Sequence, residues 1–116
     1  MQVRIPPGLR FRTEVTLALP GDQRAWDAMV DGPGIAVAFE CYSRLEDAQA
    51  TERFLNLKQR DSGVPCVVLV LKDSRHNRAA IAAASGLRRA FPVTGRAVFA
   101  ALRAGKQPKA NGLMFL

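Results

Sequence analysis

The chain has 116 residues, of which 48% are hydrophobic and 23% charged, so its composition excludes a disordered or collagen-like chain and fits one globular domain. Two cysteines are too few for a disulfide scaffold. No apolar run suits a membrane span or a signal peptide, so we expect a cytoplasmic protein. The net charge of +7 is uneven, because residues 1–71 hold 8 Lys and Arg against 9 Asp and Glu, whereas residues 72–116 hold 9 against 1.

The N-terminal segment predicts an irregular arm followed by a strand. Residues 1–12 contain Pro and Gly and form the arm, and residues 13–116 form a single α/β domain. Arg12–Leu19 alternates apolar and polar side chains, which predicts a strand with one buried face. Pro20, Gly21 and Asp22 then predict a turn.

The next two segments predict a hairpin. Ile35–Tyr42 is rich in β-branched and aromatic side chains and predicts a strand. Arg24–Val30 is ambiguous, because it suits a short helix capped by Asp22 or the partner strand of a hairpin. The turn sequence of residues 31–34 favours the hairpin.

From Ser43 onward the pattern changes to helical spacing. Ser43 and Glu46 predict a capping box, and the helix should end at residues 61–63. Cys66–Leu71 is apolar on both faces and predicts a central strand. The remaining expected elements are a helix over residues 75–89 capped by Asp73 or Ser74, a strand over 91–93, a helix from Thr94 to Gly105 and a strand over 112–116. The expected fold class is α/β, a mixed sheet with an N-terminal antiparallel hairpin, then strand–helix repeats, with helices on both faces.

The hairpin brings two acidic side chains together. With residues 31–34 as the loop, Val30 pairs with Ile35 and Asp27 lies opposite Ala38. Asp27 and Glu40 then share a face as diagonal neighbours, about 7–8 Å apart at the backbone. Two carboxylates at that separation can bind one Mg²⁺ ion.

An Asp on one hairpin strand, a Glu on the next and a crossover helix after it resemble the PD-(D/E)XK, or restriction-endonuclease-like, fold. GDQRAWDAMV, LKQRDSG and DSRHNR are similar to C-terminal domains of helix-turn-helix transcriptional regulators from high-GC bacteria. The resemblance implies a nuclease-like module acting on DNA or RNA, with Asp27 and Glu40 as catalytic Mg²⁺ ligands and the helix-turn-helix part outside this chain. The lysine expected two residues after the second acid is Tyr42, and Trp26 replaces the proline before Asp27, so catalytic activity stays open.

The resemblance also implies that a catalytic group can lie on the following helix, where Gln49, Arg53 and Lys58 are candidates. If that helix begins near Ser43, Gln49 lies about 8 Å along it and Lys58 about 20 Å. Glu40 lies about 10 Å before the strand end, so Gln49 should be level with it and Lys58 should lie beyond.

The basic side chains predict where an anion would bind. The C-terminal ends of the two parallel strands should meet at one sheet edge, where helix N-termini favour phosphate. The phosphate-binding candidates are Arg53, Lys72, Arg75, His76 and Arg78, and the wider basic footprint is Arg88, Arg89, Arg96, Arg103, Lys106 and Lys109. The alternative is a non-catalytic sensing or dimerisation module, in which a Glu40, Arg75 and His76 pocket binds a small anion, a protein partner or a second copy of the chain.

Overall fold

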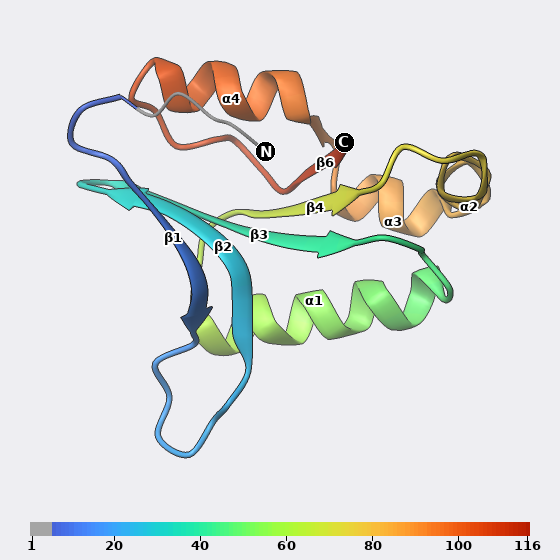
Figure 1. Cartoon of the computed structure of the whole chain (residues 1–116), viewed down its shortest axis with the longest axis horizontal. Helices are drawn as coiled ribbons and strands as arrows, with labels where there is room; N and C mark the ends of the chain where they lie inside the picture. The colour runs from blue at the N-terminus through green and yellow to red at the C-terminus, as the bar shows by residue number, and fades with distance from the viewer. Residues whose placement is uncertain (1–5) are drawn as a thin grey trace.

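The computed structural model describes residues 6–116 and has the α/β fold class expected from the sequence (Figure 1). In chain order its elements are β1 (Arg10–Thr16), β2 (Ala25–Gly32), β3 (Ile35–Tyr42), α1 (Ala48–Ser62), β4 (Val67–Leu71), α2 (Arg75–Ala83), α3 (Ser85–Ala90), β5 (Val93–Thr94), α4 (Gly95–Arg103) and β6 (Gly112–Phe115). The strands form one mixed sheet in the order β1-β2-β3-β4-β6-β5. β1, β2 and β3 are antiparallel neighbours, and β3, β4, β6 and β5 run parallel.

Helices cover both faces of this sheet. Leu55 of α1, Ile81 of α2 and Leu87 of α3 pack in one core cluster with Trp26 and Leu69, whereas α4 contributes to a second cluster on the opposite face. Figure 1 shows α1 and α4 on opposite sides of the strands. Every residue of β4 is buried, because this central strand is covered on both faces, as its continuous apolar sequence predicts.

The hairpin is confirmed, but its predicted register is wrong. Gly32 lies opposite Ile35 and Met29 opposite Ala38, so Pro33 and Gly34 alone form the loop. Gly34 adopts a positive φ of 72°, which glycine tolerates without strain, and this permits the tighter turn. The shift is two residues, so it moves Asp27 along the partner strand from Ala38 toward Glu40.

The first strand also differs from its prediction. It begins at Arg10, so residues 10–12 belong to β1 rather than to the arm, and residues 1–5 of the predicted arm lie outside the described residues. It ends at Thr16, two residues before Ala18, whose positive φ of 61° interrupts the extended backbone, and Glu14 within the strand also has a positive φ of 50°. Pairing with β2 skips Glu14, where the alternation of β1 breaks.

Two of the predicted helices differ from those observed, one in where it begins and one in being divided. α1 begins at Ala48 with Asp47 as its N-cap, whose side chain accepts from the Ala50 N–H, so the predicted capping box at Ser43 is wrong. Its end is confirmed, since Gly63 closes the helix with φ 74°. The predicted helix over residues 75–89 is two helices separated at Ala84, and Ser74 caps the first of them. Within residues 6–116, no helix is long and apolar enough to cross a membrane.

Candidate functional site

The candidate site lies where the β2–β3 ladder ends. The last paired residues are Ala28 and Phe39, and beyond them side-chain carboxylates replace the backbone partners. The Asp27 N–H donates to Glu40 Oε1 at 3.3 Å, and the Cys41 N–H donates to Asp27 Oδ2 at 2.8 Å. The two predicted acids are therefore brought together, and each binds the backbone of the opposite strand.

A third side chain, Lys58 of α1, completes this cluster. Lys58 Nζ donates to Glu40 Oε1 at 2.9 Å and to the Ala25 carbonyl at 2.6 Å. The ammonium also lies 4.3 Å from the centre of the Trp26 ring, within the range of a cation–π contact. Lys58 is only 2% exposed, so its charge is held by the protein rather than by water.

The position of Trp26 explains how this lysine is enclosed. Trp26 is 1% exposed and packs in the core cluster on the α1 face, whereas Ala28, two residues later, packs on the opposite face. A regular strand would place both side chains on one face, so the alternation breaks between them. Asp27, at the break, is exposed, and its side chain is free to reach the Cys41 N–H.

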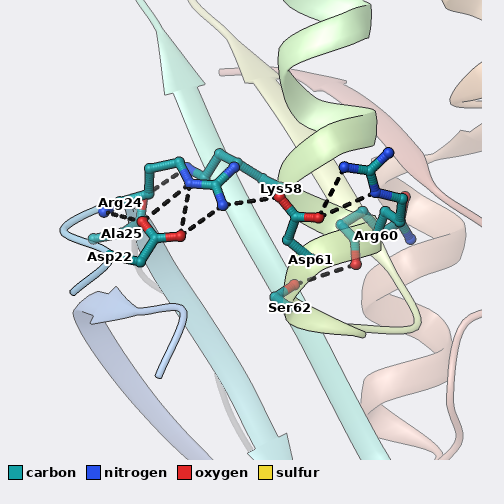
Figure 2. A network of polar contacts seen from close by, with 8 residues as sticks. Asp22, Arg24, Ala25, Lys58, Arg60, Asp61 and Ser62 are labelled. Atoms are coloured by element: carbon teal, nitrogen blue, oxygen red, sulfur yellow. Dashed lines mark hydrogen bonds and ion pairs between the residues drawn. The ribbon is translucent and has the colours of Figure 1, made fainter. Parts of the chain in front are cut away.

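A polar network fixes the C-terminal end of α1 beside the start of β2 (Figure 2). Arg24 pairs with Asp22 at 2.6 Å and with Asp61 of α1 at 2.9 Å, and Arg60 also contacts Asp61 at 3.1 Å. Lys58 lies one turn before Asp61. The network therefore sets the height of α1 against β2 at the level where Lys58 meets Glu40.

The charges at the site shift several pKa values. Burial raises the pKa of Glu40, an effect that the Lys58 hydrogen bond opposes without cancelling. Burial and the neighbouring acids raise the pKa of Cys41 and of Tyr42. In the adjoining network the hydrogen bonds from Arg24 lower the pKa of Asp22 to about 2. The site thus holds a buried acid, Glu40, beside an exposed acid, Asp27.

The prediction that Gln49 lies level with Glu40 and Lys58 beyond it is wrong. Gln49 is exposed near the start of α1 and lines a hollow with Glu52 and Ala83, whereas Lys58 contacts Glu40. Because α1 begins at Ala48, Lys58 lies about 15 Å along the helix rather than about 20 Å. The loop before it extends past the end of β3, and this offset brings Lys58 back to Glu40.

The side chain of Asn77, in the first turn of α2, holds that loop. Its side chain is fully buried and accepts from the Leu45 N–H at 2.8 Å, while its amide donates to the Ser43 and Lys72 carbonyls at 3.1 and 2.9 Å. The His76 Nε2–H donates to the Leu45 carbonyl at 2.9 Å. From the sequence, Asn77 belongs with Arg75, His76 and Arg78 to a helix start that favours phosphate or carboxylate, and no local signal identifies the Leu45 loop as its partner.

The predicted phosphate-binding residues do not join the carboxylate cluster. Glu40 contacts Lys58 and Asp27, whereas His76 contacts Leu45 and Arg78 pairs with Asp73 at 2.8 Å. The pocket predicted from Glu40, Arg75 and His76 is thus split between two groups of contacts. The remaining phosphate-binding candidates are exposed and make no ion pair among the described residues: Arg53, Lys72 and Arg75.

Unpaired cations dominate the C-terminal half. Of its 9 Lys and Arg residues, Arg78 alone pairs with an acid among residues 6–116. The other cations of this half are exposed: Lys72, Arg75, Arg88, Arg89, Arg96, Arg103, Lys106 and Lys109. In the N-terminal half, by contrast, Arg10, Arg12, Arg24, Arg44, Lys58 and Arg60 each contact a carboxylate.

The metal-ligating groups at the site are few. In the described part of the chain no cluster of three or more His, Cys, Asp or Glu side chains is placed to hold a metal ion. Asp27 and Glu40 supply two carboxylates, and one oxygen of each already accepts a hydrogen bond.

Comparisons of the chain with family models, curated proteins and solved structures gave no match.

Proposed function

We propose that this chain is a nucleic-acid-associated domain of restriction-endonuclease-like architecture whose carboxylate centre stabilises the fold and does not hydrolyse phosphodiester bonds. The architectural part is supported by the order of the elements. Antiparallel β2 and β3 carry Asp27 and Glu40, and α1 crosses over from β3 to the parallel strand β4. This is the arrangement that the sequence resemblance implies for a nuclease-like core.

The loss of hydrolysis is carried by one observation, the enclosure of Lys58. A lysine that assists an attacking water needs a hydrogen-bonding position open to that water. Lys58 is 2% exposed, two of its three ammonium N–H groups donate to Glu40 and to the Ala25 carbonyl, and the Trp26 ring lies 4.3 Å from the nitrogen. A divalent cation on Glu40 would also lie beside this buried positive charge, which opposes its binding. The residues present therefore do not fit a catalytic Mg²⁺ site.

Binding to nucleic acid is supported by eight exposed cations of residues 72–116 that pair with no acid in the part of the chain that the structure describes. Cations without acidic partners are free to replace the counterions of a phosphate backbone. Lys72 and Arg75 lie at the start of α2, where the helix dipole also favours an anion. Because helix-turn-helix modules read sequence in the regulators that the chain resembles, we expect binding by this domain to be independent of base sequence.

The test combines a binding and a cleavage measurement on the same protein. Fluorescence anisotropy with labelled DNA and RNA duplexes of two unrelated sequences should show binding that weakens steeply between 50 and 200 mM salt, about tenfold or more for several phosphate contacts. Lys72→Ala with Arg75→Ala should weaken this binding. The matched control is Arg44→Ala, because Arg44 is exposed but paired with Glu46 at 2.8 Å. Absence of salt-dependent binding would reject the nucleic-acid role.

The cleavage measurement uses the same duplexes with Mg²⁺ or Mn²⁺. We expect no strand scission above the background of a Glu40→Gln variant. Metal-dependent scission by the natural chain that disappears in Glu40→Gln would show that the centre is catalytic, and this outcome would contradict the proposed loss of hydrolysis.

A further inference from the structure

A separate groove lies beside α4, on the face of the sheet opposite α1. It encloses about 470 Å³, a volume within the usual range for small-molecule sites. Ala97 and Ala101, one turn apart on α4, form one wall. The other walls come from Pro92, Val93 and Thr94 before the helix and from residues 106–109 after it. Figure 1 shows the chain after α4 running back beneath the helix to reach β6.

Hydrogen bonds hold the loop that forms the far wall. The Gln107 side chain accepts from the Ala36 N–H at 2.8 Å and donates to the Ala36 carbonyl at 3.0 Å, so it pairs with β3 like a short strand. At the end of α4 the Lys106 N–H donates to the Ala101 carbonyl at 2.8 Å. Gly105, with φ 69°, makes the turn between them. The groove therefore exists before any ligand enters it.

The lining is mostly apolar and includes two cations. Pro92, Val93, Ala97, Ala101 and Pro108 offer carbon surface, whereas Lys106 and Lys109 are exposed. Among residues 6–116 no acidic residue lines the groove, and Asp73, the single acid of residues 72–116, is paired with Arg78. An apolar pocket with a few cations suits a ligand that combines an apolar body with an anionic group.

We propose that this groove binds a small amphiphilic anion, with an apolar chain or ring along α4 and a carboxylate or similar head group at Lys106 and Lys109. The groove extends beside most of α4, whose nine residues span about 13 Å. Free carbonyl oxygens at the end of α4 would repel an anionic head group. The last carbonyls of the helix, those of residues 100–102, instead accept hydrogen bonds from the backbone N–H groups of residues 104–106. A nucleotide base is a poorer occupant, because none of the described residues lining the walls is aromatic and able to stack on it.

The probe is decanoate, titrated below its micelle concentration and followed by isothermal calorimetry and by amide shifts of the isotope-labelled chain. We expect saturable binding with shifts concentrated at the amides of Ala97, Ala101, Lys106, Gln107 and Lys109. Replacing both lysines, Lys106→Gln and Lys109→Gln, should weaken decanoate about tenfold, since two partly exposed ion pairs are lost. Arg103→Gln, an exposed cation of α4 outside the lining, should not.

A steric pair of variants keeps the test independent of charge. Ala97→Phe fills the groove from an exposed helix position and should abolish binding, whereas Ala100→Phe adds the same ring at an exposed α4 position outside the lining and should leave it intact. Decan-1-ol, which has the chain without the charge, should bind more weakly than decanoate. Equal affinity for the two probes, or shifts that lie away from α4, would overturn the proposal.

Discussion

Lys58 Nζ and Glu40 Oε1 lie 2.9 Å apart, and both side chains are buried. Because Lys58 also donates to the Ala25 carbonyl, one side chain from α1 connects the start of β2 to the end of β3. The β2–β3 ladder stops at Ala28 and Phe39, so this connection lies where the two strands have lost their backbone pairing. The pair therefore joins a helix to a weakened end of the sheet.

Removing the lysine should be strongly destabilising. Lys58→Met keeps the length of the side chain but leaves Glu40 as a buried acid without a cationic partner, which typically costs about 3–5 kcal/mol. Urea unfolding should show this loss. The double variant with Glu40→Gln should recover much of it, because Gln still accepts from the Asp27 N–H. Arg53→Ala, an exposed and unpaired site on the same helix, serves as the control. If the double variant were no more stable than Lys58→Met, the coupling between the two charges would be refuted.

The raised pKa of Glu40 predicts a stability that falls with pH. Because the folded chain holds this proton more tightly than the unfolded chain, the contribution is complete below the ordinary value of 4.5 and is lost as pH rises through the folded pKa. Unfolding free energies of the natural chain should therefore decline relative to those of Glu40→Gln as pH rises above 4.5. A relative increase over that window would mean that Lys58 outweighs burial at this acid.

The salt-bridged network beside α1 predicts an acid with a very low titration midpoint. Arg24 Nε donates to Asp22 Oδ1 at 3.1 Å, and Arg24 Nη2 donates to Asp22 Oδ2 at 2.6 Å. These hydrogen bonds lower the pKa of Asp22 to about 2. An NMR titration of the Asp22 carboxyl carbon should show this midpoint. In Arg24→Gln the midpoint should return toward 3.8, the ordinary value. An unchanged midpoint would show that Arg24 is not the cause.

Truncating the Asn77 side chain should lower the free energy of unfolding strongly. Asn77→Ala leaves the Leu45 N–H and two loop carbonyls without their partner, which should cost about 3 kcal/mol. Hydrogen exchange at the Leu45 amide should accelerate more than at amides of β4. Asn56→Ala, at an exposed site of α1, should change stability by less than about 0.5 kcal/mol. A small effect at both sites would contradict the role given to Asn77.

Local patterns were enough to predict most elements, because periodicity and turn residues act over a few positions. The hairpin, the buried strand β4 and the end of α1 at Gly63 all follow from such signals. The start of α1 does not follow from such signals, since Ser43 and Glu46 match a capping box as well as Asp47 matches an N-cap. The helix begins after Asp47 because Leu45 is buried in the loop before it and is held there by Asn77 of another helix. Tertiary contacts of that kind leave no local trace.

The candidate site was predictable in part for the same reason. Asp27 and Glu40 meet because hairpin neighbours are set by alternation, and an error of two residues in register preserved the face. The partner of Glu40 required the absolute height of α1, which depends on the loop before it and on the Arg24 network after it. The enclosure of Lys58 by Trp26 required the break in β2, and a strand pattern alone does not reveal such a break.

The irregular backbone of β1 has a consequence for self-association. β1 is an outer strand, and an open row of backbone donors and acceptors is a template on which another chain can add. The positive φ at Glu14 turns the backbone out of line midway, and the charged side chains of Arg10 and Glu14 are exposed along it. An outer strand with a bent backbone and exposed charges is a poor template for the addition of another strand.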